Sequence, residues 1–115
     1  MSKLDITSIR KTLIDEQATL GADIENEQNK LHLYTETNPD ALDLADKRLH
    51  QAIIINRLGN MEERLIQVTV ALKRLDEGLY GICARCGNNI NPERLRAVPY
   101  ATLCVTCQER LERVR

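Results

Sequence analysis

The sequence predicts an all-α-dominated protein, a long antiparallel two-helix coiled-coil hairpin followed by a small four-cysteine module and a short C-terminal helix. Three observations support this. The 115 residues contain no Phe or Trp and only 3% aromatic residues, which is little for a compact globular core. Three prolines leave two long stretches uninterrupted, both with apolar residues at helical spacing. Four cysteines form two C-x2-C pairs near the end of the chain.

The first helix is expected over about residues 4–37. Apolar residues recur along it at the spacing of one buried helical face: Ile6, Ile9, Leu13, Leu20, Ile24, Leu31 and Tyr34. Asn38 is a favourable N-cap and Pro39 suits the first helical position, so a second helix is expected to begin there. A connection this short makes the helices antiparallel, and each is expected to be about 50 Å long at 1.5 Å per residue.

The second helix is expected to end near Gly78. Its apolar residues alternate in steps of three and four, as in a helix that packs lengthwise on another helix. These residues are Leu58, Met61, Leu65, Val68, Leu72, Leu75 and Leu79, and upstream Leu42, Ala45, Leu49 and Ala52 follow the same rule. We expect a phase slip between the two sets, near residues 53–55. Gly21 and Gly59 are predicted to mark close packing or a gentle bend.

The net charge of −1 hides an uneven distribution along the chain. Residues 1–78 hold 14 acidic and 10 basic side chains, whereas residues 79–115 hold 3 and 6. We expect these two segments to be separate domains, the hairpin with an acidic tip near 38–45 and the cysteine module with its C-terminal helix. The first residues lack the apolar core of a signal peptide, and no apolar run is long enough to cross a bilayer. The protein is therefore predicted to be cytoplasmic, without membrane association.

The cysteines Cys83, Cys86, Cys104 and Cys107 form the pattern C-x2-C-x17-C-x2-C. A two-residue gap lets both thiolates of a pair face one ion, and two pairs supply the four donors of tetrahedral zinc. Two disulfides or a redox pair are the alternatives, but a cytoplasmic chain disfavours the first, and a redox motif leaves the second pair unexplained. We predict a zinc finger holding one structural Zn²⁺ per chain. Four thiolates leave no open position for a substrate, so the site is not expected to be catalytic and no enzyme is predicted.

The residues around the cysteines form a longer pattern. It comprises the run Asp76–Gly87, then Ile90, Arg94, Leu95, Ala97, Pro99, Ala101, Cys104 and Cys107. Over about residues 72–108 this pattern resembles the four-cysteine zinc finger of the DksA/TraR family. The segment Asp40-Ala41-Leu42-Asp43-Leu44-Ala45 also fits the D-x-x-D-x-A pattern that DksA-like proteins carry at the end of their coiled coil.

The resemblance implies a transcription regulator that binds RNA polymerase directly rather than promoter DNA. In the family, the coiled coil enters the secondary channel of the polymerase and modulates initiation, often during the stringent response. By this resemblance Asp40, Asp43 and Ala45 form the tip that approaches the polymerase active site. From the residues alone a second interpretation stays open, since acids in a first helical turn also complement the positive end of the helix.

Guanosine tetraphosphate acts together with some members of the family, which carry basic residues at three positions. Those positions hold Gln67, Val98 and Gln108 in this chain. Because a nucleotide with several phosphates needs cationic partners, we expect weak or absent synergy with this nucleotide.

The main alternative function is a zinc-finger nucleic-acid-binding or adaptor protein. It would use the arginines of the second segment: Arg94, Arg96, Arg110, Arg113 and Arg115. Such binding falls steeply with salt and needs no polymerase. The scarcity of aromatic side chains for base stacking and the slightly acidic chain argue against it, and no direct sequence-specific DNA binding is expected.

Overall fold

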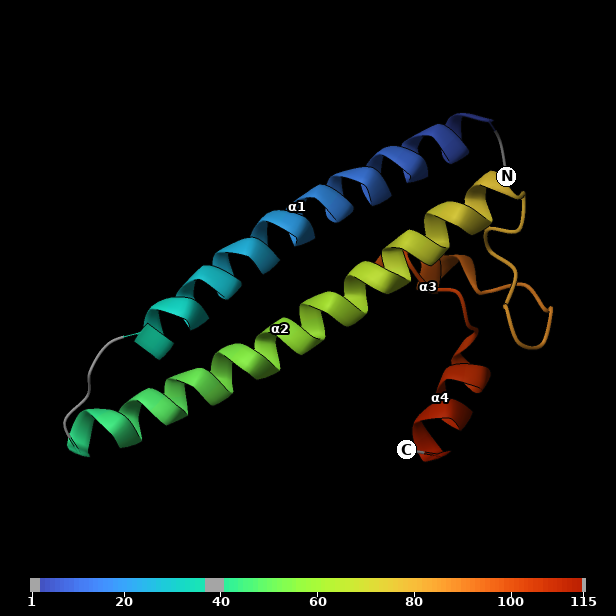
Figure 1. The fold of residues 1–115 in the computed structure, drawn as a ribbon. Helices are drawn as coiled ribbons and strands as arrows, with labels where there is room; N and C mark the ends of the chain where they lie inside the picture. Colours follow the sequence, from blue (N-terminus) through green and yellow to red (C-terminus); the bar gives the residue numbers. More distant parts are fainter. Residues whose placement is uncertain (1–2, 37–40, 115) are drawn as a thin grey trace. The chain divides into compact units, whose positions relative to one another are not determined.

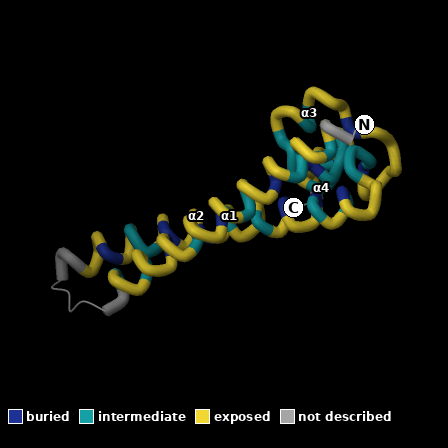
Figure 2. Tube along the Cα trace, turned by 90° about the horizontal axis from the view of Figure 1, so that it is seen from above, coloured by how far each residue is buried: buried dark blue, intermediate teal, exposed yellow. Residues whose placement is uncertain are grey.

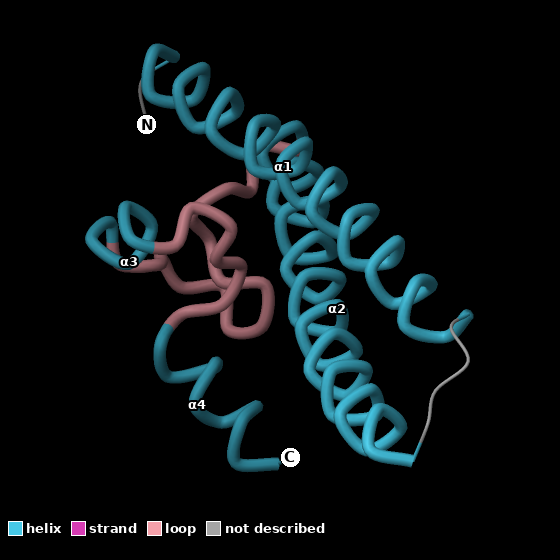
Figure 3. The backbone as a smooth tube through the Cα atoms, turned by 90° about the vertical axis from the view of Figure 1, so that its left-hand side faces the viewer, coloured by secondary structure: helices cyan, strands magenta, loops and turns pink. Residues whose placement is uncertain are grey.

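The computed structural model describes residues 3–36 and 41–114, and Figure 1 shows their arrangement in four helices. The two long helices are α1 (Lys3–Glu36) and α2 (Ala41–Asp76), and the two short ones are α3 (Pro92–Ala97) and α4 (Val105–Val114). Turns and loops form the rest of the described chain, which has one isolated antiparallel bridge and no strand (Figure 3). The predicted fold class is therefore confirmed. Asn38 and Pro39, the predicted cap and first residue of the second helix, lie outside the described residues.

The chain divides into two compact units. Unit 1 comprises Met1–Gln17 and Ile66–Arg115, and unit 2 comprises Ala18–Leu65. The long helices thus contribute to both units, so this division does not follow the predicted domains, which stay a prediction. No helix in the described part of the chain combines the length and apolar character needed to cross a membrane.

In unit 1, the first turns of α1 pack on the last turns of α2 through an apolar seam. Its buried residues are Leu13, Val68, Ala71 and Leu75. Two polar contacts also join these helix ends, because Gln17 Nε2 donates to Thr69 Oγ1 at 3.3 Å and Arg10 forms an ion pair with Asp76. Burial of the aliphatic side chains is the main stabilising term for such a pair of helices.

In unit 2, the remaining parts of α1 and α2 form an antiparallel pair whose seam is partly polar. Leu20, Ile54 and Leu58 are buried there, but so are Glu27 and Lys47, with 5% and 9% of their surfaces exposed. Figure 2 shows how buried positions recur along the helices between exposed ones. The predicted seam of the first helix is correct here, since Ile24, Leu31 and Tyr34 are half-buried. Glu27, which occupies the same face, escaped the prediction.

The predicted seam of the second helix is wrong upstream of residue 54. Ala45, Leu49 and Ala52 are exposed, Leu49 by 59%, and the burial of Leu42 is not described. The covered residues instead continue the downstream pattern with no phase slip, in steps of four and three: Lys47, Gln51, Ile54, Leu58 and Met61. A search for apolar residues misses this face because polar residues hold two of its positions. Leu79 also departs from the prediction, since it follows the end of α2 and is 37% exposed.

Close packing does not explain the two glycines in the helices of unit 2. Apart from its chain neighbours and the nearby backbone of its own helix, a methyl group built at Gly21 or Gly59 has no atom within 4 Å. We therefore expect Gly59→Ala to raise the free energy of unfolding by up to about 1 kcal/mol, because Gly is the poorer helix former and space is available. Urea denaturation followed by circular dichroism measures this change, with Gly21→Ala as a second instance. A lower free energy of unfolding for both variants would show that the glycines have a structural role.

Candidate zinc centre and coiled-coil tip

A Schellman turn ends α2 and leads the chain into the cysteine module. The Leu79 N–H donates to the Arg74 carbonyl at 2.8 Å and the Gly78 N–H to the Leu75 carbonyl at 3.2 Å. Gly78 has a φ of 75°, which an L side chain would strain. The Arg74 side chain also donates to the Ile82 carbonyl at 2.9 Å, so it fixes the start of the module against the helix that precedes it.

The first cysteine pair lies in a tight hairpin loop. The Cys83 N–H donates to the Asn88 carbonyl at 2.8 Å, and the Gly87 N–H donates to the Cys83 carbonyl at 3.0 Å. Gly87 has a φ of 77°, which explains the glycine after the second cysteine. The Cys86 N–H points to the Cys83 sulfur at 3.5 Å, so backbone dipoles favour negative charge on that sulfur.

The second cysteine pair lies where the last loop enters α4. The Gln108 N–H donates to the Cys104 carbonyl at 2.9 Å, and the Ala84 N–H joins the two loops by donating to the Thr102 carbonyl at 2.8 Å. Two side chains brace the connection by donating to backbone carbonyls, Tyr80 to Pro99 at 2.8 Å and Arg94 to Leu103 at 3.1 Å. The backbone therefore brings both pairs together.

The four sulfurs form one cluster. Each lies within 4.8 Å of the others, and the Cys86 and Cys104 sulfurs are 3.8 Å apart. No disulfide links these four cysteines. Cys83 and Cys107 are buried together with Ile90, and Leu95 and Leu103 pack against them. Four sulfurs from two C-x2-C loops are the donor set of a tetrahedral structural zinc site, so the residues fit the ion.

The electrostatics of the cluster also favour a bound cation. Burial raises the pKa of Cys83, but N–H donors from Cys86, Cys104 and Arg85 outweigh it and lower that pKa to about 5. The pKa of Cys107 is raised to about 12, because its thiol hydrogen-bonds to Cys104 and is removed from water. Four thiolates this close repel one another strongly, and a divalent cation is what allows all of them to lose their protons.

The predicted tip lies in unit 2 but is only partly described. Asp40 is outside the described residues, and Asp43 lies in α2 with a side chain that is not described. Ala45 is exposed on α2. The three positions predicted to lack nucleotide-binding cations all lie in unit 1, where Gln67, Val98 and Gln108 are half-buried.

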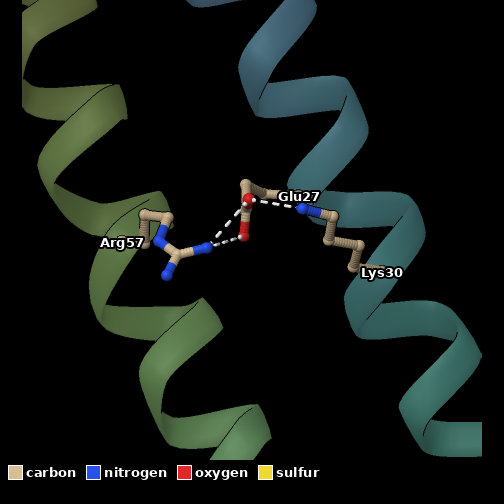
Figure 4. Close-up of polar contacts among 3 residues, drawn as sticks. All are labelled: Glu27, Lys30 and Arg57. Carbon is tan, nitrogen blue, oxygen red and sulfur yellow. Dashed lines mark hydrogen bonds and ion pairs between the residues drawn. The ribbon is translucent and has the colours of Figure 1, made fainter.

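A buried carboxylate in unit 2 is the main polar feature that the sequence did not reveal. Both oxygens of Glu27 accept from Arg57 Nη1, at 3.2 and 3.4 Å, and Lys30 Nζ donates to one of them at 3.3 Å (Figure 4). Burial pushes the pKa of Glu27 up, but Arg57 and Lys30 outweigh burial and hold that pKa below its usual value. The ionised carboxylate therefore contributes stability at neutral pH, which is lost as the pH falls through its folded-state pKa.

Comparison with known proteins identifies the family. The model of the prokaryotic DksA/TraR C4-type zinc finger matches residues 78–113. The solved structure of transcription factor DksA2 from Pseudomonas aeruginosa matches 98% of this chain and 87% of its own, with a TM-score of 0.83 and 31% identity. The chain belongs to the DksA/TraR family.

Other members are similar over smaller parts or at lower identity. The RNA polymerase-binding transcription factor DksA of Caulobacter vibrioides is 34% identical over 79 residues, which are 69% of this chain and 56% of the relative. The structure of an RNA polymerase-binding transcriptional regulator from Chlamydia trachomatis matches 98% of this chain and 93% of its own, with a TM-score of 0.64 and 25% identity. The chain thus spans about half the length of its curated relatives named DksA. These DksA/TraR relatives are transcription factors and not enzymes, in agreement with the sequence prediction.

Proposed function

We propose that this DksA/TraR protein is a transcription regulator that binds RNA polymerase directly and inserts its coiled-coil tip into the secondary channel to modulate initiation. The observation that carries the proposal is the match over 98% of the chain to the DksA2 structure. Two relatives, from C. vibrioides and C. trachomatis, are named for binding RNA polymerase. A cytoplasmic location follows if the proposal is correct.

The zinc finger has a structural role in this proposal. Cys83, Cys86, Cys104 and Cys107 would hold one Zn²⁺ per chain, which fixes the two loops and the start of α4. When bound, the ion would neutralise the thiolate charge and link the two cysteine loops. With four sulfur ligands it offers no position for a substrate. The module therefore has a structural role and not a catalytic one in this proposal.

The long helices and their acidic segment supply the regulatory part. At 34 and 36 residues, α1 and α2 are each about 50 Å long at 1.5 Å per residue, enough to reach into a channel that excludes globular domains. Asp40 and Asp43 stand three residues apart in the sequence, a spacing that in the predicted helix would put both carboxylates on one face. Carboxylates delivered near a polymerase active site affect basic side chains or bound Mg²⁺ there.

A binding and initiation assay tests the proposal directly. The purified zinc-loaded protein should co-elute with core RNA polymerase and change the lifetime of open complexes at a ribosomal RNA promoter. The alternative zinc-finger nucleic-acid-binding function predicts retention on DNA or RNA without polymerase, with an affinity that falls steeply as salt increases. Failure to bind core polymerase, with or without such retention, would overturn the proposal.

We also expect little synergy with guanosine tetraphosphate. Gln67, Val98 and Gln108 replace the cations that the nucleotide's phosphates need, so adding it should change the protein's effect on initiation by less than about twofold. Titration of the nucleotide in the same initiation assay measures this. The variant Gln67→Lys with Gln108→Lys is the matched control and should gain synergy. Strong synergy in the unaltered protein would contradict this expectation.

A further inference from the structure

We propose that Glu27 and Arg57 are positioning residues, whose ion pair in the seam of unit 2 sets the register of α1 against α2 and thereby the placement of the Asp40–Ala45 tip segment. This inference rests on the proposed function for its regulatory consequence. Its structural part concerns unit 2 alone, and this part can be tested without the polymerase.

The pair has the geometry of a register lock, that is, an ion pair that forms in only one alignment of the two helices. The Glu27 side chain is only 7% exposed and comes from α1, whereas Arg57 comes from α2 and is 49% exposed. Arg57 therefore extends from the exposed edge of the seam, and its Nη1 donates to both carboxylate oxygens of Glu27 (Figure 4). A slide of one helix by a single turn moves these groups about 5 Å apart, which leaves a carboxylate in the seam without its main partner.

The neighbouring seam makes such a lock necessary. Beyond Ile54 toward the tip, the described contacts between the helices include an aromatic stack and a polar contact. The Tyr34 and His50 rings stack with centroids 5.2 Å apart, and Gln51 Nε2 donates to the Tyr34 carbonyl at 3.3 Å. Apolar contacts between helices can re-form after a shift of register, whereas a buried polar contact is lost, so the polar contact specifies the register. In unit 2 the Glu27–Arg57 ion pair is a position-specific charge contact between the two helices.

The same helix carries Asp43 and Ala45 of the tip segment, so the register fixes where these two positions lie. Asp43 precedes Arg57 by two heptads, about 21 Å along α2, and these two positions lie on nearly the same face of the helix. A rotation or slide of α2 that breaks the ion pair therefore moves Asp43 equally. A misplacement of about 1 Å can cost an active site about 100-fold, so a loose register would weaken the effect on initiation more than it weakens binding.

Spin-label distances in the full zinc-loaded chain test the register. Labels on ketone-bearing residues at the exposed positions Glu25 and Asn60 leave the cysteines untouched. The unaltered protein should give one narrow distance distribution. Glu27→Leu with Arg57→Leu should keep or raise the melting temperature, since well-packed apolar residues of similar volume can replace a buried ion pair without loss of stability, yet should broaden or split the distribution. Ile54→Leu, a volume-conserving change in the same seam, is the matched control and should stay narrow.

Regulation is then measured on the same variants. At saturating polymerase occupancy, the double leucine variant should lose about tenfold of its effect on open-complex lifetime, and Ile54→Leu should lose little. If the double variant does not fold, Glu27→Gln replaces it and should also broaden the distribution. A narrow, unshifted distribution in the folded variant overturns the register lock, and a broad distribution with full regulation overturns its link to the tip. If the unaltered protein fails to bind polymerase, the proposed function fails, while the distances still decide the register.

Discussion

Replacing Cys83 by serine is expected to unfold the cysteine module while unit 2 stays helical. The module has a small apolar core, because its buried cluster comprises Cys83, Ile90 and Cys107 with Leu95 and Leu103 packed against it, and two of the buried residues are proposed zinc ligands. The described part of the module has one isolated bridge, between Ile82 and Asn89, and no strand. Structural zinc contributes about 10–16 kcal/mol of binding free energy in isolated zinc-finger peptides, far more than so small a core supplies.

Two measurements check this prediction. Zinc released by a thiol-modifying reagent should approach one ion per chain in the unaltered protein and fall near zero in Cys83→Ser. Amide exchange should show loss of protection in α3 and α4 of the variant but not in residues 18–65 of α1 and α2. Thr106→Ser, an exposed change between Cys104 and Cys107, is the matched control and should retain zinc. Full zinc content in Cys83→Ser would contradict the proposed ligand set.

The cysteine cluster is the part of the molecule that sequence spacing predicts best. Ligand geometry restricts each pair to a short loop, so the two-residue gap of Cys83 and Cys86 carries the structural information locally. The side-chain hydrogen bonds that hold the loops around the cluster could not be predicted in this way. Tyr80 and Arg94 donate to the backbone carbonyls of Pro99 and Leu103, and a carbonyl acceptor has no residue signature in a sequence.

The helical seam shows where periodicity is insufficient. In unit 1 the buried positions are apolar, and the step pattern found the correct face at Leu13 and Val68. In unit 2 the covered face includes Lys47 and Gln51, while Leu49 points to solvent. Lys and Gln have long stems that fill a seam position while their polar ends reach partners at its edge, so burial there does not require an apolar residue.

The tip is predicted to matter for regulation and not for binding. Asp40→Asn with Asp43→Asn should leave the affinity for core polymerase within about threefold but reduce the effect on initiation by at least about tenfold, a difference of about 1.4 kcal/mol. The asparagines keep the size and helix-capping ability of the aspartates and remove only their charge. The expected loss therefore isolates the electrostatic contribution of the two carboxylates of the proposed tip.

The same variant decides between the two interpretations of these acids. If they only complement the positive end of the second helix, their removal costs about 0.3–1 kcal/mol of stability each and leaves regulation intact. Thermal unfolding and open-complex lifetimes, measured side by side, separate these outcomes. Glu62→Gln, an exposed charge removal elsewhere on α2, is the matched control and should regulate normally. Regulation by the double variant that equals that of the unaltered protein would refute the tip assignment, because no other acidic pair of this chain matches the D-x-x-D-x-A pattern.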